Sequence, residues 1–331
     1  MFIVDNIGLA IIFCVITMLG WGSWANTLKL AGKDQWQFPL YYWDYAIGVF
    51  ILGIVMIATL GISGELGMGS FVNLAQADSA PVTRALVSGV LFNISNILLV
   101  VAIDTAGMSV AFPVGVGLAL VIGTVASYAQ APKGNSAMLF AGVGLVMCAM
   151  ILSAIAYSRL PRRGNTGWAK GVVFAVIAGC LMGFFYPHLS SAISPGFGKG
   201  DIQPGYLTPY TALFLFGAGL LASNFVVNTV FMKSAGLTYS SYFRGSLRLH
   251  SLGFLGGLIW MLALSLNLIA SGVAGPAVSY ALGQGATLVA AIWGVFIWRE
   301  FQTAPQGTGK FIAAMFVGYT CGLVLIGLAT L

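Results

Sequence analysis

A carboxylate and an imidazole stand inside long apolar runs of this sequence, where each could carry a proton. Asp44 follows three aromatic residues at 41–43, and His188 follows Pro187 at the end of another run. Ionisable groups in hydrocarbon are costly, so each needs a partner or a function. We expect Asp44 and His188 to take part in proton coupling. The alternative for both is a place at the membrane interface, with Asp44 stabilising a helix N-terminus within an aromatic belt.

Indole rings and an amide form a second set of candidates. Trp21 and Trp24 are three residues apart and share a helix face, and Asn26 follows them. Indole rings can stack on a planar heterocycle or pack on the face of a sugar, while an amide reads the polar edge of the same solute. These three residues therefore predict a solute contact, with packing between helices as the alternative.

Polar pairs at helical spacing recur in three later runs. Asn93 and Asn96 form one polar stripe, which we expect to line a solute pocket unless they are hydrogen-bonding glue between helices. Tyr280 and Gln284 share a helix face, and an amide without a partner in lipid is expensive, so we expect both side chains to contact a solute. A similar pair at 224 and 228 has less context, and there we expect bonding between helices.

The elements that carry these residues follow from the composition. Of 331 residues, 59% are hydrophobic and 7% charged, unlike the composition of a water-soluble domain. A membrane-spanning helix takes about 20 apolar residues, and these runs are longer than the alternating segments of a barrel. The sequence therefore predicts an all-α membrane protein. Its ten transmembrane helices should lie near residues 7–28, 39–62, 84–104, 107–129, 136–157, 168–189, 206–232, 248–270, 273–298 and 309–330.

Two segments 168 residues apart resemble each other and divide the chain into halves. Residues 110–117 read VAFPVGVG, residues 278–285 read VSYALGQG, and a Leu-Val pair follows each segment after two residues. Gln284 replaces Val116 in this comparison, so one half gains a polar group. We predict two inverted five-helix repeats, at 1–157 and 168–331, joined by a cytoplasmic linker at 158–167. Chance similarity of glycine-rich helices is the alternative.

The positive charges predict an orientation. With the N-terminus outside, eleven of the 14 Lys and Arg residues fall near inner loops, and only Arg84, Lys133 and Lys199 face outward. Short cytoplasmic loops accumulate Lys and Arg, so this arrangement is favoured. We expect an integral protein of the plasma (inner) membrane with both termini external.

The sequence lacks the motifs that several other classes of membrane protein require. The chain has no Walker-type GxxxxGK[ST] motif for a pump, no HExxH or Cys partner beside its two His residues, and no repeated filter sequence for a channel. We expect no enzyme activity, no catalytic or metal site and no cofactor. Secondary transport remains, and its solute should be small, polar and uncharged, because no predicted helix core carries Lys or Arg. A membrane receptor or scaffold that binds without transporting is the alternative from another class.

The run at 110–124 resembles the ureide permease family of the drug/metabolite transporter superfamily, as do Tyr-Trp-Asp-Tyr at 42–45 and Gly-Trp-Gly-Ser-Trp at 20–24. The resemblance covers nearly all ten helices and implies proton-driven uptake of allantoin, related ureides or nucleobases. The glucose/ribose porters of the same superfamily are a rival resemblance, which would imply a monosaccharide. Plant members carry a long hydrophilic central loop with a nucleotide-binding-like motif, and the short linker here puts nucleotide-dependent regulation in doubt.

The expected mechanism is alternating access, in which the two repeats rock about a central site. The partners are then a small-molecule solute, protons or sodium as the coupling ion, and the lipid bilayer, with no nucleic acid. These residues leave open whether the chain forms a homodimer and which ion drives transport.

Overall fold

The computed structural model describes residues 1–32, 35–160 and 168–330. Within these ranges the regular elements are helices, apart from an isolated β-bridge between Ile193 and Leu207. Most of the predicted linker at 158–167 lies outside the described residues, including Arg162 and Arg163, which contributed to the predicted inner charge.

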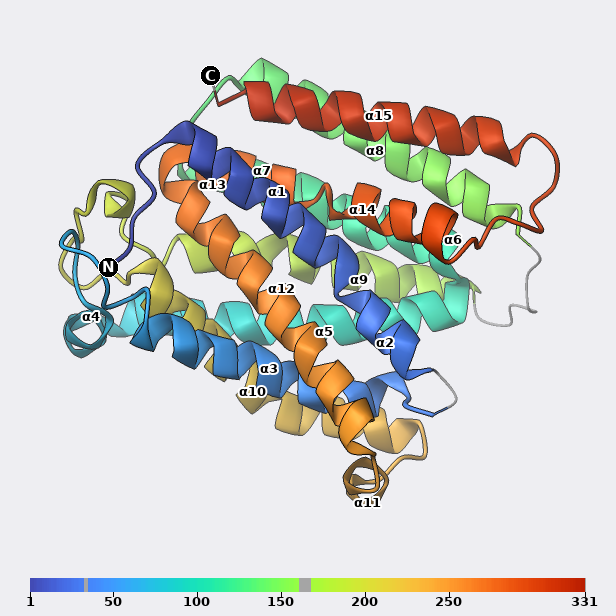
Figure 1. Cartoon of the computed structure of the whole chain (residues 1–331), viewed down its shortest axis with the longest axis horizontal. Coiled ribbons are helices and arrows are strands. Elements are labelled where there is room, and N and C mark those ends of the chain that lie inside the picture. Colours follow the sequence, from blue (N-terminus) through green and yellow to red (C-terminus); the bar gives the residue numbers. More distant parts are fainter. Residues whose placement is uncertain (33–34, 161–167, 331) are drawn as a thin grey trace. The chain divides into compact units, whose positions relative to one another are not determined.

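Ten of the described helical stretches are long and apolar enough to cross a membrane (Figure 1), which confirms the predicted fold class. The chain is therefore an integral membrane protein. In order, the spans consist of α1 (Ile7–Ser23) with α2 (Ala25–Ala31), α3 (Phe38–Ala58), α5 (Ser79–Ala106), η1 (Phe112–Val116) with α7 (Gly117–Gln130), α8 (Ser136–Ser158), α9 (Trp168–Ser190), α10 (Pro209–Ser234), α12 (Leu247–Ala274), α13 (Pro276–Gly283) with α14 (Ala286–Ile292) and η3 (Trp293–Ile297), and α15 (Thr308–Leu328). The shorter elements are α4 (Ser70–Gln76), α6 (Met108–Ala111), η2 (Phe197–Lys199) and α11 (Tyr239–Phe243).

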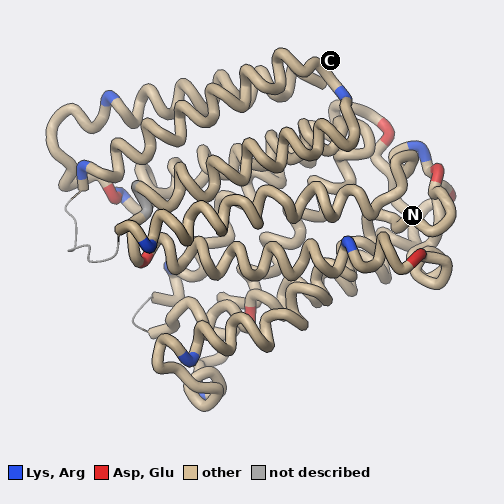
Figure 2. The backbone as a smooth tube through the Cα atoms, turned by 180° about the vertical axis from the view of Figure 1, so that it is seen from behind, with Lys and Arg blue, Asp and Glu red and all other residues tan. Residues whose placement is uncertain are grey.

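Charged residues lie mostly at helix ends and in connecting segments, and the lengths of the described helices are nearly free of them (Figure 2). A charge in the middle of a bilayer is costly, whereas a charge near a helix end reaches water or lipid headgroups. The helices can therefore sit in hydrocarbon with their charges outside it.

The chain forms two compact units, and each takes segments from both halves of the sequence. Unit 1 consists of Met1–Asn93 and His188–Val273, and unit 2 of Ile94–Pro187 and Ala274–Leu331. These units differ from the predicted repeats at 1–157 and 168–331. A compact unit consists of helices that pack together, whereas a repeat consists of consecutive helices whose sequences resemble those of the other half. The inverted repeats stay a prediction.

Inside the units, helices pack in pairs that the predicted repeats would relate. In unit 1 the second span, α3, packs along the seventh, α10, where a Cβ on Gly217 would lie 3.1 Å from the Cα of Phe50. In unit 2, α8 packs along α15, and Gly142 and Gly322 each lie against the other's backbone carbonyl. The fourth and ninth spans pack through α7 and α13. Small residues let helix backbones approach closely, which is how such pairs form in lipid.

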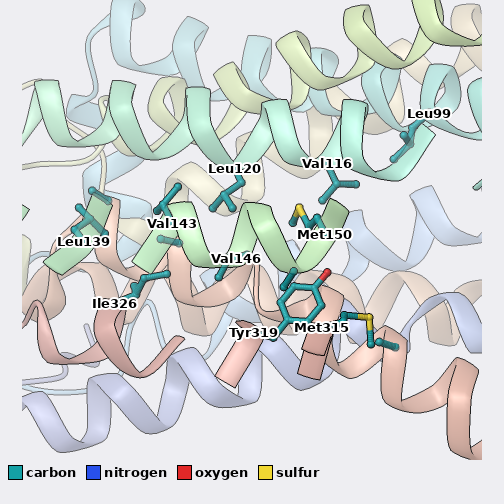
Figure 3. Packing of buried hydrophobic residues seen from close by; sticks show 14 of the residues in the cluster. Leu99, Val116, Leu120, Leu139, Val143, Val146, Met150, Met315, Tyr319 and Ile326 are labelled. Atoms are coloured by element: carbon teal, nitrogen blue, oxygen red, sulfur yellow. The ribbon is translucent and has the colours of Figure 1, made fainter. Parts of the chain in front are cut away.

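The core of unit 2 is aliphatic. Side chains of α7, α8 and α15 interlock in it, among them Leu120, Val143, Val146, Met150 and Ile326 (Figure 3). Leu120, Val146 and Ile326 are fully buried. Lipid tails are as apolar as these side chains, so close van der Waals packing is what stabilises the contact.

Two spans of unit 2 depart from a regular α-helix at the segments that resemble each other in sequence. The fourth span begins with π-helical residues that end at Val116, with Pro113 in their first turn. The ninth span breaks after α13, where Gln284 and Gly285 form a turn before α14. In the sixth span, Pro187 lies inside α9, which ends three residues later. π-Helical turns are frequent at functional sites, and broken helices are typical of transporter sites.

Candidate functional site

Asp44 lies in a group of polar and aromatic side chains of unit 1. Its Oδ1 accepts a hydrogen bond from the Tyr242 hydroxyl at 2.7 Å. The Nδ1 atom of His250 lies 2.9 Å from Oδ1 and 3.0 Å from Oδ2. Asp44 is 5% exposed, and the ring of Trp36 meets the His250 ring edge-on at 5.1 Å. We call Asp44, Tyr242, His250 and Trp36 the carboxylate cluster.

Glycines bring the elements of the carboxylate cluster together. A Cβ on Gly253 of α12 would lie 2.6 Å from the Cβ of Asp44, so only a residue without a side chain fits there. A Cβ on Gly245, between α11 and α12, would lie 2.6 Å from His250 Nε2. The hydroxyl of Thr238 caps α11 and fixes the short helix that carries Tyr242. The sequence thus folds so that α11 and α12 close over the start of α3.

The carboxylate cluster holds two groups in contact that can each carry a proton, Asp44 and His250. Burial, and then the neighbouring Asp44 carboxylate, raise the pKa of the Tyr242 hydroxyl above its ordinary value, so Tyr242 stays protonated and donates. An imidazole and a carboxylate in contact can share one proton while the pair as a whole stays near neutral. The side chain of His250 is 26% exposed, which leaves it open to exchange with water.

A pocket of about 340 Å³ opens beside the carboxylate cluster. Trp36, Gly245 and Leu249 form the wall that it shares with the cluster, and Gln37 and Arg244 add polar groups. The pocket therefore adjoins the carboxylate cluster through Trp36.

Aromatic side chains form a second group in unit 1. Trp21 stacks on Trp260 with the ring centroids 6.0 Å apart, and its Nε1 donates to the Trp260 carbonyl at 3.3 Å. Trp24 and Tyr45 are 5.0 Å apart, and Tyr45 lies 6.3 Å from Trp260. Phe92 of α5 completes the group at 4.1 Å from Trp260. The structure therefore places the two predicted indoles in one aromatic group.

The other residues predicted to contact solute have identifiable neighbours. In unit 1, Asn26 of α2 donates to the carbonyl of Ser23 at the end of α1 at 2.9 Å. In unit 2, Tyr280 donates to the carbonyl of Ala119 at 3.1 Å and is fully buried. Gln284 is 8% exposed and lies at the helix break.

Asn93 and Asn96 differ in their contacts. Asn93 donates through Nδ2 to the Ser223 hydroxyl at 2.8 Å, within unit 1. Asn96 belongs to unit 2, is 5% exposed, and its Nδ2 has no hydrogen-bond partner among the described residues. The proposed roles of both residues stay predictions.

The histidine that contacts Asp44 is not the one that the sequence singled out. His188 lies in the last turn of α9, and the imidazole on Asp44 is that of His250. The sequence separates Asp44 and His250 by 206 residues, so no local spacing links them. The one feature of the sequence that could have indicated His250 as a partner of Asp44 is that the chain has only two His residues. As for metals, no group of three His, Cys, Asp or Glu side chains within the described ranges could hold an ion.

Comparisons with known proteins agree with this architecture. A family model described as "Ureide permease" matches residues 41–162, which include Asp44 and the run at 110–124. "Ureide permease 1" and "Ureide permease 4" of Arabidopsis thaliana are 21% and 22% identical to this chain, and each alignment covers 98% of both proteins. "Probable ureide permease A3" of Vigna unguiculata is 28% identical over 45% of this chain and 41% of its own length.

A solved crystal structure of another protein shares the fold. Its TM-score is 0.59 at 15% identity, over 97% of this chain and 99% of the other. The relatives are permeases and not enzymes. With ten apolar helices and similarity along 98% of its length, this chain is an integral membrane protein that is similar to ureide permeases.

Proposed function

We propose that this protein is a secondary active permease that imports a small, polar, uncharged solute, of the ureide or nucleobase class, together with protons. The two five-helix repeats expose the site alternately to the two sides of the membrane. The solute class is supported by the relatives, which are ureide permeases in plants. An uncharged solute also agrees with the positions of the charged residues. Lys and Arg lie near the ends of the described helices, so the middle of these helices offers no cation to an anionic solute.

The observation that carries the proton coupling is the contact of Asp44 with His250 inside a membrane-spanning stretch. A lone carboxylate there would be costly when ionised, whereas a carboxylate and an imidazole can exchange a proton with little change of buried charge. Such a pair can bind a proton on one side of the membrane and release it on the other when its access to water changes. The open pocket beside Trp36 supports access on one side.

The aromatic group of unit 1 supports a planar solute. Indole, phenol and phenyl rings provide flat apolar faces whose centroids are 4.1–6.3 Å apart. The contact of Asp44 with His250 is the reason that we favour protons over sodium as the coupling ion. We place the protein in the plasma (inner) membrane with both termini outside, on the positive charge of its inner loops.

A thermal-shift screen of the purified protein tests the solute class, because a bound solute stabilises the folded state by mass action. The panel consists of allantoin, uracil, adenine, glucose and ribose. We expect allantoin or a nucleobase to raise the melting temperature, and the two sugars to leave it unchanged. A response to glucose or ribose alone would favour a monosaccharide porter and contradict the proposal.

A further inference from the structure

Several fully buried residues of unit 1 carry polar atoms without hydrogen-bond partners among the described residues, and Tyr45, Asn93 and Asn224 are three of them. Asn224 of α10 has no partner for its amide nitrogen or its amide oxygen among the described residues. Asn93 of α5 bonds Ser223 through one end of its amide, and the other end is unpaired. The Tyr45 hydroxyl of α3 is also unpaired. We call Tyr45, Asn93 and Asn224 the polar layer.

The packing of α10 on α3 fixes where Asn224 points. Asn228 donates to the carbonyl of Pro39 at 2.9 Å, and Gly217 packs against the α3 backbone further along. Asn224 lies four residues from the first contact and seven from the second, so it shares their face of α10. The helices run antiparallel, which sets Asn224 opposite residues 42–43 of α3, next to the Tyr42 ring that stacks on Tyr45 at 5.1 Å.

Asn93 of α5 lies beside the part of α10 that carries Asn224. Its bond to Ser223 puts it beside the residue that precedes Asn224. Phe92, the residue before Asn93, lies 4.1 Å from Trp260, and Trp260 lies 6.3 Å from Tyr45. The polar layer is therefore flanked by the aromatic group described above.

Unpaired polar atoms of this kind need an explanation. Buried amides and hydroxyls are nearly always hydrogen-bonded, and in hydrocarbon they are expensive when they are not. Asn224 has an unused donor and an unused acceptor, and Asn93 has one unused end of its amide. The Tyr45 hydroxyl can both donate and accept a hydrogen bond. A planar solute with an N–H beside a C=O would satisfy these groups, and its faces would meet the aromatic rings.

We propose that the polar layer is the site that recognises the solute, with Asn224 as its central residue. The solute class is a planar ureide, cyclic imide or nucleobase that presents N–H and C=O on one edge. This inference rests on the proposed function and adds the site to it. Bonding between helices was the expectation for both amides of α10, and the structure gives that contact to Asn228. Because the layer is buried, the solute reaches it when the surrounding helices separate, as alternating access requires.

Two readouts on the purified full-length protein test the proposal: the melting temperature without solute, and the dissociation constant for allantoin and for uracil. Asn224→Leu removes an unpaired amide and keeps the number and branching of its heavy atoms, so we expect an unchanged or raised melting temperature. The same variant should bind the solute at least about 10-fold more weakly, because the solute's own polar edge then loses its partner.

Two further variants sharpen the test. Asn228→Leu is the matched control. Asn228 lies one helical turn from Asn224, and its replacement removes the hydrogen bond to the Pro39 carbonyl. It should lower the melting temperature and leave the affinity unchanged. Tyr45→Phe removes only an unpaired hydroxyl, so it should keep the melting temperature and weaken binding.

Two results would overturn the proposal. One is a melting temperature that falls in Asn224→Leu as it does in Asn228→Leu, and the other is an unchanged affinity in Asn224→Leu. Failure of the proposed function looks different, because the wild-type protein itself would then bind neither allantoin nor uracil. The melting temperatures still decide whether Asn224 is an unpaired group or a packing contact.

Discussion

Among single residues, Asp44 is tied to two hydrogen-bonding neighbours that favour different protonation states. The Tyr242 hydroxyl donates to Oδ1 at 2.7 Å and stabilises the ionised carboxylate. The His250 ring offers a second place for the proton at 2.9 Å. Burial opposes the ionised form, so the balance between these contacts sets the pH at which the proton moves.

Replacement of Tyr242 by Phe should shift this balance. Loss of the donor disfavours the ionised carboxylate, so the pH profile of solute uptake should move to higher pH by roughly one unit. The measurement is uptake in proteoliposomes over a range of external pH. Tyr239→Phe is the control, because the Tyr239 hydroxyl bonds Thr229 and not Asp44. An unmoved profile in Tyr242→Phe would mean that proton transfer does not involve the carboxylate cluster.

Among the elements, α12 and α3 approach because small residues line their contact. Cβ atoms on Gly253 and Gly256 would meet Asp44 and the Tyr41 hydroxyl, and one on Gly257 would meet the Tyr45 backbone. The aromatic and carboxylate groups both depend on this approach. Their geometry is thus a property of helix packing as much as of the residues themselves.

Gly253→Ala tests this packing. The new Cβ would lie 2.6 Å from that of Asp44 and 2.9 Å from the Tyr41 carbonyl, so the helices must move apart. We expect a loss of about 1–3 kcal/mol of stability, read as a lower melting temperature. Gly144→Ala in α8 is the control, since nothing lies within 4 Å of its Cβ. Equal melting temperatures for the two variants would contradict the tight contact.

The break in the ninth span is a second feature of the helices that can be tested. Gln284 ends α13 at the turn, and the related position in the fourth span is Val116. If the solute binds at this break and not at the polar layer, Gln284→Ala leaves a polar group of the solute unsatisfied, which should weaken binding by about 5-fold to 150-fold. Insertion into the membrane should be spared, because the change removes a polar group. Normal expression with unaltered affinity would make Gln284 a contact between helices only.

For the whole molecule, the ten spans could be predicted because bilayer thickness sets the length of an apolar run. Asp44 and the indoles could also be found, since their residue types are unusual inside such runs. The role of His250 could not, because its contact with Asp44 depends on α12 packing against α3. The distinction between Asn224 and Asn228 was hidden for the same reason, since only packing on α3 shows which amide meets a carbonyl. The two compact units likewise depend on helix pairing.

Orientation in the membrane is a further prediction at this scale. The positive charges place the segment from Arg159 to Lys170 in the cytoplasm and both termini outside. A single cysteine at Ser158, in a variant without the four native cysteines, should resist a membrane-impermeant thiol reagent in intact cells and react after the cells are opened. A cysteine next to Lys133 should react in intact cells, and the reverse pattern would invert the topology.

Proton-coupled transport by way of Asp44 is the central claim, and accumulation of labelled allantoin in proteoliposomes under an imposed pH gradient tests it most directly. Wild-type protein should accumulate allantoin when the outside is acidic, and Asp44→Asn should only exchange labelled for unlabelled allantoin, since binding and rocking survive without proton release. Binding without accumulation by the wild type would indicate a receptor. Gradient-driven accumulation in Asp44→Asn equal to that of the wild type would contradict the account.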